Sequence, residues 1–107
     1  MEDRKKKVFS YLGFAARARK LATGYNTCIY MMEKHKVRLL LLAEDLSANS
    51  AEKMEAASKK NRVPYRVFGT VEELSKKTGN IEKGIYGVLD ENFAKVILEW
   101  IDSDPSR

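Results

Sequence analysis

The chain has 107 residues, which fits a single domain and leaves no room for a second independent core. Hydrophobic residues make up 44% of it and charged residues 33%, a balance that excludes an intrinsically disordered chain. Apolar runs are short: residues 39–43 fall far below the ~20 residues of a membrane-spanning helix, so we expect no membrane partner. The one cysteine, Cys28, cannot form an internal disulfide, and no apolar signal region follows the basic start. We therefore expect a cytoplasmic protein.

The formal net charge of +5 is unevenly distributed. Residues 1–38 carry ten Lys and Arg against three acidic residues, a net charge of +7, whereas the remaining residues carry ten basic and twelve acidic residues, a net charge of −2. A basic first third favours a phosphate-backbone partner, because neutralising phosphates releases condensed counterions. A well-solvated surface explains the same pattern, and charge alone leaves both interpretations open.

Apolar spacing predicts helices and strands in alternation. A first helix runs to about Ala18, because Val8, Tyr11, Leu12 and Ala15 recur at helical spacing. A short strand over residues 20–23 then reaches Gly24. A second helix follows, and one of its sides consists of Cys28, Ile29, Met31, Met32 and His35.

Residues 37–43 form a continuous apolar run that predicts a central strand buried on both faces. Ser47 or Asn49 can cap a third helix that extends to about Lys60. Residues 63–68 then predict another strand, with Pro64 near its start, where the missing N–H is tolerated.

The last third follows the same alternation. Thr70 and Glu73 have the spacing of a capping box that opens a fourth helix, and Gly79 ends it. Residues 84–89 predict the final strand. Asp90 caps a last helix whose apolar face consists of Phe93, Val96, Ile97, Trp100 and Ile101.

Strands separated by helices imply crossover connections and a sheet covered on both faces. The expected fold is therefore α/β, a three-layer α/β/α sandwich with a mixed sheet of about four strands. We expect one domain over residues 1–107, with a compact core at about 6–101 and a tail at 102–107.

Catalytic residues are scarce. His35 is the only histidine, so neither a histidine-paired triad nor a histidine metal cluster can form. Cys28 has no activating neighbour in the sequence and is expected in the core. Glu44 and Asp45 follow a strand, but adjacent residues of an extended segment point in opposite directions, so they do not form an acid–base pair. Without a Gly-rich phosphate loop, no cofactor is expected either.

Residues 18–27 contain the most distinctive pattern. Basic residues Arg19 and Lys20 precede Gly24, and polar residues Tyr25, Asn26 and Thr27 follow it at a helix start. A helix N-terminus offers free N–H groups to phosphate, and an asparagine amide can read a base edge. A purely structural interpretation stays open, in which the glycine makes the turn and Asn26 or Thr23 caps the helix.

These segments resemble the L7Ae (kink-turn-binding) ribosomal protein family, in particular its short bacterial members of the YlxQ type. The resemblance covers about residues 6–101, and the matching segments are residues 11–20, 23–27, 36–45, 63–65 and 73–79. The family reads RNA with a Gly-x-Asn-Glu-x-x-Lys pattern, which Gly24 and Asn26 match here. Thr27 stands where the family has Glu, and Tyr30 where it has Lys. Residues 81–85 correspond to a loop that packs on RNA in the family.

The resemblance implies a non-catalytic protein that binds a structured, kink-turn-like RNA, ribosomal or translation-associated. The expected RNA-binding residues are Arg17, Arg19, Lys20, Gly24, Asn26, Thr27, Tyr30 and Lys83, with Lys36 and Arg38 as further contributors. Ribosome-associated proteins are additional candidate partners. The alternative is a protein-interaction module of the translation machinery that kept the fold and lost kink-turn recognition. An enzyme using Glu44 and Asp45 is disfavoured.

Overall fold

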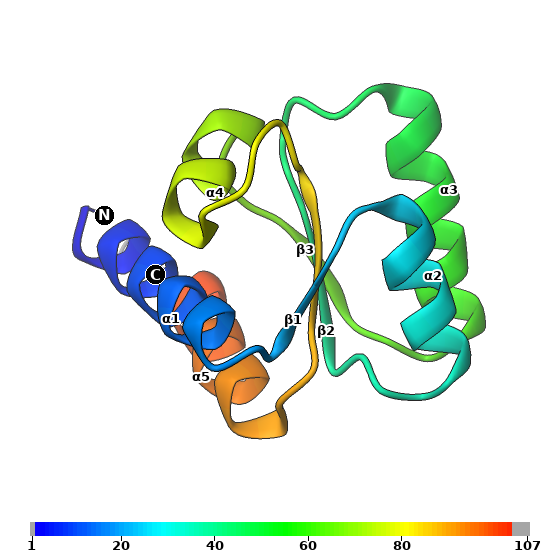
Figure 1. The fold of residues 1–107 in the computed structure, drawn as a ribbon, viewed down its shortest axis with the longest axis horizontal. Coiled ribbons are helices and arrows are strands. Elements are labelled where there is room, and N and C mark those ends of the chain that lie inside the picture. The colour runs from blue at the N-terminus through cyan, green and yellow to red at the C-terminus, as the bar shows by residue number, and fades with distance from the viewer. Residues whose placement is uncertain (1, 104–107) are drawn as a thin grey trace.

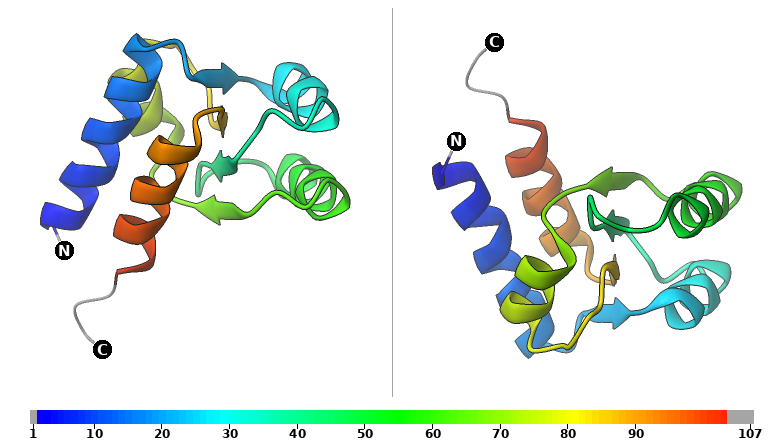
Figure 2. Two further views of the ribbon diagram at one scale, coloured as in Figure 1. Left: turned by 90° about the horizontal axis from the view of Figure 1, so that it is seen from below. Right: turned by 90° about the horizontal axis from the view of Figure 1, so that it is seen from above.

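A computed structural model describes residues 2–103, and in it a sheet lies between two layers of helices (Figure 1). Figure 2 shows the same layers from below and from above. The elements of the described chain are, in order, α1 (Glu2–Arg17), β1 (Leu21–Thr23), α2 (Tyr25–Glu33), β2 (Leu39–Leu42), α3 (Ala48–Lys60), β3 (Tyr65–Val67), α4 (Val71–Thr78), β4 (Ile85–Val88) and α5 (Glu91–Asp102).

The sheet is mixed, with strand order β1-β4-β2-β3. Strand β2 pairs with β3 in parallel, whereas β4 runs antiparallel to both β1 and β2. Val88 lies opposite Leu21 on one side and Leu39 on the other. This arrangement confirms the predicted three-layer fold with four strands.

Strand β2 is the centre of both hydrophobic cores. All four of its leucines have an exposed fraction of 0%, as predicted for a strand covered on both faces. Leu39 and Leu41 pack in the core under α1, α4 and α5, and Leu40 and Leu42 pack in the core under α2 and α3. The alternation follows from the two-residue period of a strand, which places successive side chains on opposite faces.

Local sequence signals fix the starts of three helices. The Ser47 hydroxyl accepts a hydrogen bond at the start of α3, so this residue is the cap of the two candidates. Thr70 and Glu73 form the predicted capping box of α4, and Gly79 ends that helix in the left-handed conformation at φ 77°. Asp90 caps α5, also as predicted.

Helices α1, α2 and α3 each end with a non-glycine residue in the left-handed conformation, namely Arg19 (φ 59°), His35 (φ 60°) and Arg62 (φ 59°). The next N–H in each case bonds a carbonyl five residues back, as from Lys20 to Ala15 at 2.8 Å. This is the closure of a Schellman motif, which turns the chain sharply away from the helix axis.

His35 does not continue the side of the second helix on which we placed it with Cys28, Met31 and Met32. Helix α2 ends at Glu33, and His35 is exposed in the turn that follows. Helical spacing stops applying where the chain reverses, and the sequence carries no glycine to mark that point.

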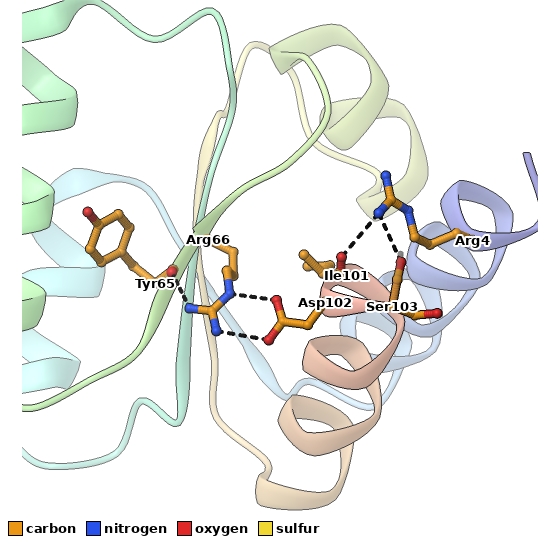
Figure 3. Close-up of polar contacts among 6 residues, drawn as sticks. All are labelled: Arg4, Tyr65, Arg66, Ile101, Asp102 and Ser103. Atoms are coloured by element: carbon orange, nitrogen blue, oxygen red, sulfur yellow. Dashed lines mark hydrogen bonds and ion pairs between the residues drawn. The ribbon is translucent and has the colours of Figure 1, made fainter. Parts of the chain in front are cut away.

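Two arginines fasten the end of α5 to the rest of the fold (Figure 3). Arg66 of β3 forms a bidentate ion pair with Asp102, with Nε–Oδ1 and Nη2–Oδ2 distances of 2.8 and 2.9 Å. Hydrogen bonding to the Asp102 carboxylate raises the pKa of the Arg66 guanidinium. Arg4 of α1 donates to the carbonyls of Ile101 and Ser103 at 3.3 and 3.0 Å.

Helical structure thus extends past the expected core of 6–101 at both ends, from Glu2 to Asp102. Asp102, which we expected in the tail, belongs to the last helix. Ser103 follows as the C-cap of that helix, and residues 104–107 of the expected tail lie outside the described residues.

Gly84, just before β4, gives the first test of the packing. A Cβ at this position would lie 2.8 Å from Cγ2 of Val71 and 3.0 Å from Cβ of Ala43. Gly84→Ala is therefore expected to lower the free energy of unfolding by about 1–3 kcal/mol, measured by urea denaturation. The control is Gly79→Asn, because a Cβ there meets nothing within 4 Å and asparagine tolerates a positive φ. Equal losses in both variants would contradict the crowding argument.

Candidate nucleic-acid interface

The N-terminus of α2 is open to a ligand. Gly24 precedes the helix at φ 95° and ψ 165°, a conformation available to glycine, and its N–H donates to the carbonyl of Ile85 at 2.9 Å. No side chain caps the helix, so the proposed capping roles of Thr23 and Asn26 are wrong. Asn26 and Thr27 in the first turn are exposed, and that turn contains no acidic residue. The free N–H groups and the positive dipole end therefore face solvent unneutralised.

The loop between α4 and β4 brings a cation to this helix end. A Cβ placed on Gly24 would lie 3.9 Å from Nζ of Lys83, so the ammonium group sits directly beside the turn. Gly24, Asn26, Thr27 and Lys83 thus lie near one another at one end of β1, although Lys83 is 56 positions after Thr27 in the sequence. The lack of a side chain at Gly24 leaves room for close backbone approach.

A buried hydroxyl holds this loop in place. The Oγ of Ser75 accepts from the N–H of Lys83 at 2.8 Å and donates to its carbonyl at 3.0 Å. The hydroxyl of Tyr86, a fully buried residue, donates to the same carbonyl at 2.9 Å. Sequence reasoning missed both residues, because their hydrogen bonds depend on how α4 faces the sheet.

Ile81 in the same loop was also missed as a single residue, although its loop was identified. Its side chain is 82% exposed, the most exposed of the large hydrophobic side chains among the described residues. The exposure of Ile81 could not be predicted from the sequence, because an isoleucine in a short loop can equally pack against the core.

The remaining predicted residues lie elsewhere. Arg19 and Lys20 precede β1, at the opposite end of that strand from Gly24. At about 3.3 Å per residue, Lys20 and Gly24 are about 13 Å apart. The further contributors Lys36 and Arg38 lie beside Arg19 and Lys20, around one hollow of the surface.

Tyr30 and Arg17 occupy two further positions. Tyr30 lies one turn after Asn26 on α2, and its side chain is 57% exposed. Arg17 ends α1, with its guanidinium carbon 5.1 Å from the ring centroid of Phe14. The predicted set is therefore divided into a group at the α2 N-terminus, a group at the other end of the sheet, and these two residues.

Comparison with known proteins identifies the family. The model of the ribosomal protein L7Ae/L30e/S12e/Gadd45 family matches residues 6–96. The chain belongs to this family. The resemblance found in the sequence is thereby confirmed.

Two relatives share its length and about a third of its residues. A protein of Bacillus subtilis (strain 168) named RNA-binding protein YlxQ is 31% identical over 94 residues, covering 88% of this chain and 94% of the relative. A protein of the same name from Enterococcus faecium is 30% identical over 101 residues, covering 94% and 97%. The similarity to YlxQ-type members therefore extends over nearly the whole chain.

Solved structures agree with the fold. A protein of unknown function from Bacillus halodurans C superposes with a TM-score of 0.88 at 30% identity, covering 91% of this chain and 98% of the other. The Giardia lamblia 15.5kD RNA binding protein superposes with a TM-score of 0.79 at 15% identity, covering 94% and 87%. The second likeness concerns the fold alone.

Family membership also bears on catalysis. The family is non-enzymatic, which supports the expectation that the chain is not an enzyme. Two of the side chains considered as catalytic, those of Asp45 and Cys28, have structural roles instead. Asp45 Oδ1 accepts the N–H of Val71, the first residue of α4, at 2.8 Å. Cys28 is fully buried, and desolvation raises the pKa of its thiol to about 12.

Among residues 2–103, no group of three or more His, Cys, Asp or Glu side chains is placed to hold a metal ion. None of the helices in this range has the length and apolar character needed to cross a bilayer.

Ser75 gives a direct test of how the α4–β4 loop is held. Ser75→Ala leaves the N–H of Lys83 without its partner, so we expect the free energy of unfolding to fall by about 1–3 kcal/mol. Ser58→Ala is the matched control, because Ser58 is also buried but its hydroxyl only donates to a helix carbonyl, that of Glu55. Urea denaturation of both variants measures the difference. If Ser58→Ala proved the more damaging change, the role given to Ser75 would be wrong.

Proposed function

We propose that this chain binds RNA and recognises a structured, kink-turn-like element through the α2 N-terminus and the α4–β4 loop. Its membership of the L7Ae family and the names of its YlxQ relatives support RNA as the partner. The charge of +7 on residues 1–38 supports a phosphate-rich partner. The target is a ribosomal or translation-associated RNA of the cytoplasm, and ribosome-associated proteins are further candidate partners.

One juxtaposition carries the proposal: Lys83 beside Gly24 at an uncapped helix start. A phosphate at this point meets free N–H groups, a positive dipole end and an ammonium group together. Gly24 permits the RNA backbone to approach, and the amide of Asn26 offers a donor and an acceptor to a base edge. Phosphate contacts fix the position of the RNA, and Asn26 supplies the discrimination.

The two departures from the family signature change the chemistry of this surface. Thr27 replaces a carboxylate by a neutral hydroxyl, which can donate as well as accept and does not repel phosphates. Tyr30 replaces an ammonium group by an exposed aromatic ring, on which an unpaired base can stack. Recognition would therefore depend less on charge at these two positions and more on Asn26 and stacking.

Exposed apolar side chains on this surface favour a second candidate function. Tyr30 and Ile81 are large exposed hydrophobic side chains, and such residues also serve protein contacts. In that case the chain would be a protein-interaction module of the translation machinery that keeps the fold without kink-turn recognition.

A salt-titrated binding assay separates the two functions. We expect tighter binding to a kink-turn RNA than to a plain duplex of the same length, and we expect the difference to persist at moderate salt. Hydrogen bonds to base edges survive salt that abolishes contacts based on counterion release. Equal and steeply salt-dependent binding to both RNAs would leave only a generic basic surface and favour the second candidate.

Two single substitutions test the roles within the surface. Asn26→Ala is expected to reduce the preference for the kink-turn RNA over the duplex, by about 1–3 kcal/mol if Asn26 makes a bidentate base contact. Lys83→Ala is expected to weaken binding to both RNAs alike and to reduce the salt slope by about 1. Lys95→Ala, on the exposed side of α5, is the control for loss of one charge. Unchanged preference in Asn26→Ala would place the reading surface elsewhere.

A further inference from the structure

A second basic surface lies at the end of the sheet opposite Gly24. Five cations from two chain connections, α1–β1 and α2–β2, surround one hollow together with His35. They are Arg19, Lys20, Lys34, Lys36 and Arg38, which we call the basic cluster. Within residues 2–103, no ion pair involves any of these five side chains, and no carboxylate lines the hollow.

The backbone beneath the basic cluster is fixed. The carbonyl of Lys20 accepts from Leu89 at 2.8 Å, and the N–H of Arg38 donates to Val88 at 2.7 Å, so both connections are tied to the end of β4. The Schellman turns at Arg19 and His35 close the helices on the other side. The backbone that carries these five like charges is therefore fixed around one hollow, and no carboxylate of residues 2–103 lines it, which favours binding of a polyanion.

Helix α2 connects this cluster to the RNA-reading end. Asn26, Tyr30 and Lys34 are spaced four residues apart, so they follow one exposed side of the helix. The ammonium group of Lys34 lies 5.4 Å from the ring centroid of Tyr30, so these two side chains are in contact on that side of the helix. At 1.5 Å per residue, Asn26 and Lys34 are about 12 Å apart along the axis.

We infer that the basic cluster is a second contact region for the same RNA, holding phosphates of the helix or strand that flanks the recognised element. From the N-terminus of α2, the flanking RNA extends along the helix past the ring of Tyr30 to the basic cluster at the C-terminal end of α2. This inference rests on the proposed function. It adds that full affinity requires an RNA longer than the element that Asn26 and Lys83 contact.

The test uses the full chain and three RNAs: a minimal kink-turn, and the same kink-turn with one or the other of its stems extended by one helical turn. The cluster variant carries Lys20→Gln, Lys34→Gln and Lys36→Gln. The control variant carries Lys6→Gln, Lys53→Gln and Lys95→Gln, three exposed lysines outside both surfaces, and so loses the same charge. Dissociation constants are measured over a range of salt concentrations.

Wild type should bind at least one extended RNA several-fold more tightly than the minimal one. The cluster variant should lose this gain, and its salt slope on that RNA should fall by about 2–3 because each lost phosphate contact removes about 0.7–0.9. The control variant should retain the gain. Equal losses in the two variants, or a cluster variant that keeps the gain, would overturn the inference.

The proposed function can fail separately. A wild type that does not prefer the kink-turn to a plain duplex contradicts the proposed recognition, whatever the cluster variant does. A wild type that prefers the kink-turn but gains nothing from either extended stem contradicts only the second contact region. Absence of binding to any RNA would overturn both.

Discussion

The antiparallel pairing of β4 between β1 and β2 determines what lies at each end of the sheet. Because β4 runs against its neighbours, its first residue meets the ends of β1 and β2, and Ile85 accepts the N–H of Gly24 there. The loop that precedes β4 is thereby placed beside the start of α2. At the other end of β4, Val88 lies between Leu21 and Leu39, so the α1–β1 and α2–β2 connections that carry the basic cluster lie close together. The pairing of β4 thus positions both regions that we propose to contact RNA.

Tyr86 on this strand links the hydrophobic core to the interface. Its ring is fully buried in the core under α1, α4 and α5, and its hydroxyl reaches the carbonyl of Lys83 at 2.9 Å. A buried hydroxyl is costly unless it is hydrogen-bonded, so the core and the loop position stabilise each other. The neighbouring Gly87 keeps the opposite face of β4 close to the chain before β2, because a Cβ there would lie 3.1 Å from Cγ2 of Val37. The loop that carries Lys83 is therefore held by a strand whose two faces are packed in the hydrophobic cores.

Most of the fold could be predicted because its signals are local. The apolar run of β2 and the caps at Thr70 and Asp90 need only a few neighbouring residues to be read. The site could be predicted as a set of residues, but not as an arrangement. Lys20 and Gly24 are close in sequence, yet an extended strand separates them, whereas Lys83 reaches Gly24 only through the pairing of β4. Left-handed helix ends without glycine and inward-facing hydroxyls such as that of Ser75 leave no local signal at all.

The burial of Cys28 has a practical consequence for watching RNA arrive on this surface. The thiol is the only one in the chain, is fully enclosed, and with a pKa of about 12 is uncharged at neutral pH. Maleimide and iodoacetamide dyes react with accessible thiolates, so they should not label Cys28 in the folded state. A cysteine introduced on an exposed position such as Lys53 would then carry a single fluorophore, and the natural residue would not have to be replaced. Energy transfer from that fluorophore to a labelled RNA end would report which way the flanking stem leaves the protein.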